Sequence, residues 1–394
     1  MELKTKRMKG EEGFVLVLAL LMMLALTLIG VSAVNTTTYE NGISGNLRIS
    51  IEAFYLAEAG LHEFMGRFRT EATGEITDAN PSSPDWKLFL APNTERAAKV
   101  GYDSTNPNYV FIQSLQNEMD YGVEIVHKVD AGNNVLTWAG FPVYIAKSHG
   151  FTVQRGNKVI EAEINKVPDV DPPASLYSKS PVTVSGNSTY ITGVDTCPIG
   201  GVPKNKPGVM TMASTIIQNG LPTMDGSPPT VTNSSTNLPL TEMVTYFKDS
   251  ADFTYEYSTD TTLTGYSDGW GQPTSNGAKV PLSYTGQMNV VYFNMQGTNA
   301  LTLGGGSHGA GVLLVNGDLK VNGGFSWYGV IIVTGSFSFL GGGEKNITGG
   351  VLGDQPSVGV GGDVTILYCS NAVKQLRDRL QWAPLRMTQW RQIY

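Results

Sequence analysis

The feature that most constrains this chain is an apolar run near its N-terminus, residues 13–34, with the sequence GFVLVLALLMMLALTLIGVSAV. From Phe14 to Val34 it contains 21 residues and no charge. As a helix with a rise of about 1.5 Å per residue it would be about 31 Å long, close to the hydrocarbon thickness of a bilayer. The run therefore predicts a membrane-spanning helix that anchors everything downstream.

Three interpretations of residues 1–34 are open. A cleaved secretory signal has an apolar region of about 7–15 residues followed by a small-residue cleavage site, and this run is longer. A plain N-terminal anchor is the second interpretation, with the basic residues of the leader holding the N-terminus inside the cell. The third is a signal that is cut on the cytoplasmic side, directly before the apolar run.

Under the third interpretation the sequence resembles the type IV prepilins. In these proteins a short hydrophilic leader ends in glycine, the next residue is usually Phe or Met, and an apolar helix follows. Gly13 and Phe14 match that junction. The resemblance implies that residues 1–13 are a leader peptide, that prepilin peptidase cuts after Gly13, and that the new amine of Phe14 is methylated. Most pilins carry Glu at the fifth mature residue, which here is Leu18. This departure favours a minor pilin or a pseudopilin over a bulk, repeating subunit.

The stretch that follows the apolar run predicts an amphipathic helix, because its apolar residues recur at steps of three or four. The run AEAGL at residues 57–61, preceded by GNLR and AFYL, resembles the N-terminal region of PilX-type minor pilins. We therefore expect one helix over residues 14–65. The predicted apolar face consists of Ile43, Leu47, Ile51, Phe54, Ala57, Leu61 and Phe64.

Residues 66–166 predict a pilin-like α+β region with a small antiparallel sheet. The segment FTVQRGNKVIEAEI indicates a hairpin that turns at Gly156–Asn157, a pair suited to positive φ. In its second strand Ile160, Ala162 and Ile164 share one face, which predicts one buried and one solvated side. Residues 167–175, with three prolines and two acids, predict a linker.

The third region contains a repeat. The run that starts at Gly311, GVLLVNGDLKVNGG, has the same order of residue types as the run at Gly329, GVIIVTGSFSFLGG, 18 residues later. Repeats of about 20 residues with short β runs and glycine-rich turns predict a parallel β-helix over residues 176–370. Residues 205–285 are expected to be an insertion or irregular rungs, with a short helix over 240–249. Residues 371–394 predict a terminal helix that caps the repeat.

Charge and cysteine content narrow the function further. The net charge is −7, and residues 14–370 carry −12, which disfavours nucleic acid as a partner. Only 15% of residues are charged, against about 25% in average soluble domains, and the 46 glycines favour exported, turn-rich β structure. Cys197 and Cys369 form a possible disulfide in an oxidising compartment, and two separate thiols are the alternative.

Catalytic chemistry is not indicated. The acids of the repeat, Asp318, Glu344 and Asp354, fall at different points of their predicted rungs, and the four histidines lie far apart. We assign no catalytic, cofactor-binding or metal-binding residue, and no cofactor. The aromatic pair Trp327 and Tyr328 is interpreted as core or rung packing, with a carbohydrate platform as the alternative.

The sequence thus predicts an α+β protein: a transmembrane pilin-type helix, a small antiparallel sheet, then a parallel β-helix-like domain with a short terminal helix. The resemblance implies a minor pilin-like component of a type IV pilus, involved in pilus assembly and surface contact or adhesion. Its implied partners are other pilins, the assembly machinery, prepilin peptidase and the inner membrane, with the N-terminus cytoplasmic and the head in the periplasm or on the pilus. The alternatives are an anchored adhesin, a type II secretion pseudopilin, or an anchored polysaccharide-active enzyme. The sequence does not identify a ligand for the head.

Overall fold

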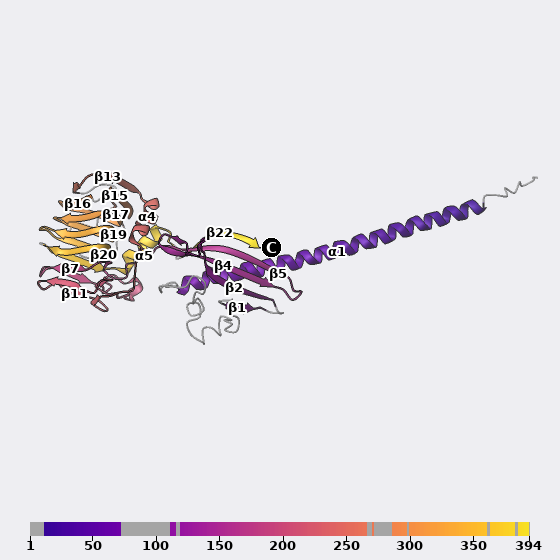
Figure 1. Ribbon diagram of the computed structural model, residues 1–394, viewed down its shortest axis with the longest axis horizontal. Coiled ribbons are helices and arrows are strands. Elements are labelled where there is room, and N and C mark those ends of the chain that lie inside the picture. The colour runs from indigo at the N-terminus through magenta and orange to yellow at the C-terminus, as the bar shows by residue number, and fades with distance from the viewer. Residues whose placement is uncertain are drawn as a thin grey trace, which may run out of the picture.

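The computed structural model of this chain describes residues 12–71, 111–115, 119–265, 270–271, 286–297, 299–360, 363–382 and 385–393. Figure 1 shows three parts in a row: a long helix, a small sheet against its far end, and a strand-rich body beyond the sheet. We call these the stem, the small sheet and the head. The α+β fold predicted from the sequence is confirmed.

The stem is a single helix, α1 (Glu12–Glu71), of 60 residues. At about 1.5 Å per residue it is about 90 Å long. Beyond the apolar run it continues through three threonines, Thr36, Thr37 and Thr38, whose hydroxyls donate to the carbonyls four residues earlier at 2.8–3.0 Å. The predicted helix is confirmed and extends to Glu71, while residues 72–110 and the first eleven lie outside the described residues.

The small sheet is antiparallel and has the strand order β1-β2-β4-β5-β22, with β3 paired to β4. The first strands come from the predicted region, but the last strand is the end of the chain. The head is therefore inserted between two neighbouring strands, β5 and β22. The strands are β1 (Phe111–Ser114), β2 (Asp120–His127), β3 (Thr137–Trp138), β4 (Phe141–Phe151), β5 (Asn157–Lys166) and β22 (Leu385–Ile393).

The stem packs on one face of this sheet, and the predicted alternation of β5 is confirmed. Ile160, Ala162 and Ile164 are buried in the cluster that joins sheet and helix. Close approach depends on Gly150, where an added Cβ would lie 2.1 Å from the carbonyl oxygen of Ala53. The β4–β5 hairpin forms, but its turn spans residues 152–156. Arg155 takes the left-handed conformation (φ 64°). The prediction had placed the turn, and its residues of positive φ, at Gly156–Asn157.

The head is a solenoid of parallel strands, as the repeat predicts. Gly311 pairs with Gly329, which confirms the 18-residue offset, and Gly329 pairs in turn with Gly349. All three have φ between 122° and 139°, and a Cβ on Gly329 would lie 2.1 Å from the carbonyl oxygen of Gly311. This row of glycines therefore forms one corner of the solenoid, where a side chain has no room.

The rungs of the solenoid build three faces. The first face holds β13, β15, the second half of β17, β6, β9 and β12. The second face holds β14, β16, β18, β7 and β10, and the third holds the first half of β17, β21, β8 and β11. The long strands β19 and β20 bend across all three. The bounds are β6 (Leu176–Ser178), β7 (Val182–Ser185), β8 (Tyr190–Thr192), β9 (Val209–Thr211), β10 (Ile216–Asn219), β11 (Thr223–Asp225), β12 (Thr230–Val231), β13 (Phe253–Tyr257), β14 (Thr261–Thr264), β15 (Asn289–Met295), β16 (Ala300–Gly304), β17 (Ser307–Asn316), β18 (Asp318–Asn322), β19 (Phe325–Leu340), β20 (Lys345–Val360) and β21 (Val364–Tyr368).

The rungs do not follow one another in chain order. The chain enters at β6, which lies between β20 on one side and β9 on the other. It winds outward to β12, crosses to β13 at the opposite end, and winds back until β20 and β21 pair with β6, β7 and β8. We call this junction of the last rung with the first the seam. Strands β9 to β14 lie within residues 205–285, so this stretch supplies irregular rungs rather than an insertion alone.

Two α-helices cover the first face of the solenoid: α4 (Leu240–Phe247) and α5 (Ser370–Arg379). Figure 1 shows both on the side of the head that faces the small sheet. The helix α4 lies within the predicted range of 240–249, and its N-cap is Pro239, without a side-chain hydrogen bond. Two 3-10 turns, η1 (Ile199–Gly201) and η2 (Lys248–Ser250), complete the elements.

The tail departs from the predicted terminal cap. The helix over 371–381 forms as α5, but it lies against the side of the solenoid and not across its open end. From Leu385 onward the chain is a strand that returns to the small sheet. The tail returns because it can pair with β5: Arg391 forms an ion pair with Glu161 across the ladder at 2.7 Å, and Leu385 is buried in the stem–sheet cluster.

Candidate functional site

The stem carries two apolar faces. The sheet covers one of them, which includes Ala53, Ala57 and Phe64. On the opposite face Leu47 and Ile51 are 59% and 45% exposed, and the equally spaced Tyr55 is exposed as well. The predicted single apolar face is thus divided: its C-terminal half meets the sheet, while Ile43, Leu47 and Ile51 are exposed and no described element covers them.

The apolar run itself is exposed throughout. Phe14 to Val34 lie in the part of α1 that extends beyond the small sheet, and Figure 1 shows no other described helix or strand beside it. Among the described residues one helix is long and apolar enough to cross a membrane, and it is this one. The Gly13–Phe14 bond lies in the first turns of α1, and the Phe14 side chain is 71% exposed.

Comparison with known families decides the class of this stem. Residues 12–62 match the family model described as PilX N-terminal. This match covers most of the stem and does not reach the small sheet or the head. The stem therefore has the N-terminal region of a type IV pilin-like protein of the minor-pilin kind, and its single apolar helix fits a membrane anchor.

Comparisons over the whole chain add little to the PilX assignment. A solved structure similar to this chain is the competence-associated pilin ComZ from Thermus thermophilus, with 10% sequence identity and a TM-score of 0.25, covering 87% of this chain and 97% of that one. A TM-score this low carries no argument about the head. No curated protein sequence matches the chain.

The seam of the head holds the two cysteines. Cys197 follows β8 and Cys369 follows β21, and these two strands are paired neighbours. The cysteines form a disulfide in the structure, with Cα atoms 5.1 Å apart, and both side chains are buried. That separation lies within the usual range for disulfides. The bond therefore joins the first turn of the solenoid covalently to the last.

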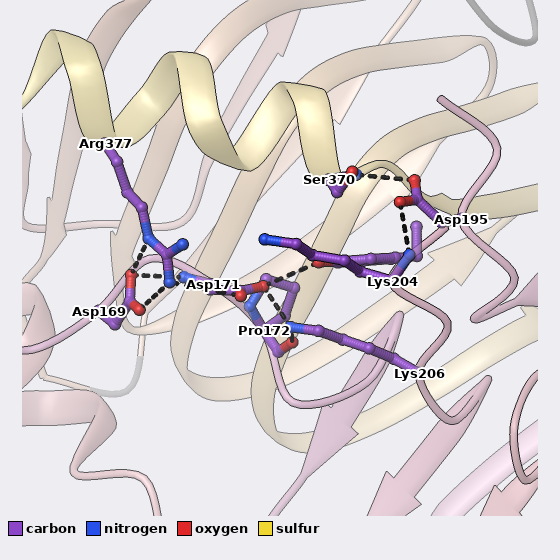
Figure 2. A network of polar contacts seen from close by, with 9 residues as sticks. Asp169, Asp171, Pro172, Asp195, Lys204, Lys206, Ser370 and Arg377 are labelled. Atoms are coloured by element: carbon purple, nitrogen blue, oxygen red, sulfur yellow. Dashed lines mark hydrogen bonds and ion pairs between the residues drawn. The ribbon is translucent and has the colours of Figure 1, made fainter. Parts of the chain in front are cut away.

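A cluster of charges lies beside the disulfide (Figure 2). Arg377 of α5 donates to both carboxylate oxygens of Asp169, with Nε 2.9 Å from Oδ1, and reaches Asp171 at 3.4 Å. Lys206 forms an ion pair with Asp171 and donates to the carbonyl of Pro172 at 2.6 Å. The incoming segment, the second rung and the outgoing helix are thereby tied together.

The electrostatics of this cluster follow from its burial. Burial lowers the pKa of Lys206, and the Asp171 carboxylate opposes that shift. Burial and the nearby Asp171 both raise the pKa of Tyr368, whose hydroxyl donates to Asp171 at 3.2 Å. Burial alone would lower the pKa of Arg377, but its hydrogen bonds to Asp169 raise it. The aspartates therefore oppose the loss of charge that burial favours in Lys206 and Arg377, and the cluster acts as a structural clamp.

A third carboxylate, Asp195, organises the backbone around the disulfide. One oxygen accepts from the N–H of Ser370 at 3.0 Å, and the other accepts from the N–H of Lys204 at 3.0 Å (Figure 2). The first oxygen also accepts from the N–H of Cys197 at 3.3 Å. Asp195 is only 6% exposed. A buried carboxylate with three backbone donors fixes the chain on both sides of the Cys197–Cys369 bond.

The acids considered for catalysis are engaged in local hydrogen bonds. Asp318 Oδ1 accepts from the backbone N–H of Ser336 at 2.7 Å, and Asp354 Oδ1 accepts from the hydroxyl of Ser180 at 3.4 Å. The strand register places Asp318 and Asp354 near one corner, two rungs apart, and thus closer than predicted, whereas Glu344 lies at another corner. Within the described ranges, no group of three or more His, Cys, Asp or Glu is placed to hold a metal ion.

Proposed function

We propose that this protein is a minor subunit of a type IV pilus or a closely related filament, and that it contributes to assembly and to contact with surfaces. The observation that carries this proposal is the uncovered apolar face of the stem, from the membrane-spanning run to Tyr55. Such a face on a PilX-type stem fits the stems of neighbouring pilins, which offer the same kind of surface.

Processing at Gly13–Phe14 is part of this proposal. Prepilin peptidase would remove residues 1–13, and the new amine of Phe14 would be methylated. The basic residues of the leader would hold the N-terminus on the cytoplasmic side of the inner membrane. Leu18, in place of the usual glutamate, supports a sparse position in the filament or a position at its tip.

The head would then remain outside the membrane. Its insertion between β5 and β22 gives it two connections to the small sheet, and the seam clamp holds these two connections together. We propose that residues 176–370 form the part that meets a target surface. The acidic balance of the chain argues against a nucleic-acid target.

A processing experiment tests the proposal. The full chain is expressed with and without prepilin peptidase, and the N-terminus is determined by mass spectrometry in membranes and in sheared filaments. We expect a Phe14 N-terminus, methylated, only when the peptidase is present, and the processed chain among the sheared filaments. An intact Gly13–Phe14 bond under both conditions would exclude the pilin assignment of the stem.

The same experiment separates the related possibilities. A processed chain that is absent from pili but present with a secretion apparatus would identify a type II secretion pseudopilin. An unprocessed chain that remains in the membrane with its head outside would identify an anchored adhesin.

A further inference from the structure

The head also touches the small sheet away from its two covalent connections. The turn between β3 and β4 meets α4, which lies on the side of the head toward the small sheet (Figure 1). The ring of Trp138 contacts the ring of Tyr246 edge to face, with the centroids 5.2 Å apart. At Gly140 an added Cβ would lie 2.2 Å from the Cβ of Pro239, so the backbone of the turn packs directly on the start of α4. We call this contact the latch.

The sequence of the turn suits this close approach. Ala139 and Gly140 both have positive φ, 48° and 78°, as in the tight two-residue turns of β-hairpins. Glycine is needed at the second position, because any side chain there would overlap the start of α4. Behind the turn Trp138 pairs with Phe141, and the Lys166 ammonium lies 5.0 Å from the centre of the Phe141 ring. The small sheet therefore holds its half of the latch in place.

The two covalent connections between the small sheet and the head are tied to each other. The Trp382 indole N–H in the outgoing connection donates to the carbonyl of Pro168 in the incoming one at 2.8 Å. The Arg377 guanidinium lies 4.8 Å from the centre of the Trp382 ring. Two connections joined in this way act as one attachment point, which fixes the position of the head but leaves its tilt to other contacts.

The junction beside the latch is not closely packed. A cavity of about 280 Å³ lies between the connections and the covering helices. Val167 and Leu385 line it from the side of the small sheet, and Tyr246 and Ser250 line it from the head. Since protein interiors contain few voids larger than a water molecule, a cavity of this size leaves room for α4 to shift. Tyr246 belongs to both features, because its ring contacts Trp138 and also lines the cavity.

We propose that the latch is a conformational device: closed, it holds the head at one tilt to the stem, and its release lets the head rock about the tied connections. The device is releasable because it consists of one ring pair and one backbone contact. Its opening breaks no strand pairing and leaves the stem–sheet cluster and the seam as they are. A latched head presents the same side outward in every copy, whereas a released head meets a surface at several angles. The inference goes beyond the proposed function and does not depend on entry into a filament.

The test measures distances in the full chain in detergent micelles by double electron–electron resonance. One pair of spin labels joins the small sheet to the head, at Gln389→Cys in β22 and Leu221→Cys in the head, both exposed positions. A second pair lies within the head, at Leu221→Cys and Thr254→Cys, and reports whether the head itself is intact. The native disulfide is buried and takes no label.

The latch is opened from either side, by Trp138→Ala in the small sheet or by Tyr246→Ala in the head. Trp138→Phe keeps a ring at the contact, and Thr245→Ala changes an exposed neighbour on the same helix. We expect one narrow sheet-to-head distribution for the wild type and these two controls, and a distribution at least about twofold wider for each alanine variant. The pair within the head should stay unchanged throughout.

Two results would overturn the inference. An equally narrow distribution in both alanine variants would show that the connections alone fix the tilt. A broad distribution in the wild type would show that the latch does not hold the head. If Tyr246→Ala disturbs the pair within the head, Trp138→Ala decides the question, because Trp138 lies outside the head.

Discussion

Cys197 and Cys369 are 172 residues apart in sequence, yet their Cα atoms lie 5.1 Å apart across the seam of the head. The disulfide joins the strand pair β8–β21, in which Ile191 lies beside Ile366. Since the chain enters the solenoid in its middle, this is where the first and last rungs meet. Strand pairing and the ion pair between Arg377 and Asp169 also hold these two ends together, and the disulfide adds a covalent link.

Removing the disulfide is expected to destabilise the seam first. Replacing both cysteines by serine releases a loop of 172 residues, which should cost about 2–5 kcal/mol of head stability. Hydrogen exchange followed by mass spectrometry should show faster exchange in β8 and β21 than in β17. Wild type treated with dithiothreitol is the control and should match the variant. Unchanged protection at β8 and β21 in both samples would contradict this role.

The ion pair between Arg377 and Asp169 should contribute measurably, because both side chains are partly buried and two nitrogens of Arg377 donate to the carboxylate. Arg377→Met is expected to lower the free energy of unfolding by about 1–3 kcal/mol. The matched control on the same helix is Lys374→Met, which breaks the exposed pair with Asp378 and should cost less than about 0.5 kcal/mol. Urea unfolding of both variants provides the comparison, and equal losses would show that the clamp contributes no more than a surface pair.

The stem and the regular half of the solenoid were predictable from the sequence, because their partners lie close by or repeat in the chain. The apolar run, the AEAGL segment and the Gly311–Gly329 repeat each contain their own signal. Val312 and Val330 occupy equivalent places in consecutive rungs, so similar residues at a fixed spacing reveal their contact.

The seam could not be predicted in the same way. Leu176 pairs with Val351. The rungs of the first part of the head lie beyond the last rung in space, so this pair does not follow the spacing of about 20 residues that reveals the other rung contacts. Asp169 lies in a proline-rich segment with the composition of a linker, and its partner Arg377 lies 208 residues later. The only signals were two acids in that segment and an excess of basic residues in the tail, and charge alone does not pair them.

The stability of the small sheet should depend on pH through His149. Burial lowers the pKa of His149 below its ordinary value of 6.5, with Glu124 opposing the shift and Lys147 adding to it. As the pH falls through 6.5 the unfolded chain takes up a proton that the folded chain resists, so stability is lost from about pH 6.5 downward until the lower folded pKa is reached.

Replacing His149 removes the imidazole that takes up this proton. His149→Gln is therefore expected to show a flatter dependence of the melting temperature between about pH 7 and pH 5 than the wild type. The matched control, His62→Gln, changes a well-exposed histidine of the stem and should keep the wild-type profile. Parallel profiles for His149→Gln and wild type would show that another group governs this pH range.

The uncovered face of the stem leads to a prediction about assembly rather than folding. Leu47 is 59% exposed and points away from the small sheet, so Leu47→Lys should leave membrane insertion and the head intact. In a filament the same position would face the stem of a neighbour, where an unpaired ammonium must leave water at a cost of several kcal/mol. We expect at least about a tenfold drop of the variant in sheared filaments, relative to its amount in membranes, measured by quantitative mass spectrometry. Leu47→Met keeps an apolar side chain of similar volume and should be incorporated like the wild type. If Leu47→Lys were recovered in filaments as efficiently as Leu47→Met, this face of the stem would not be the surface through which the protein joins other pilins.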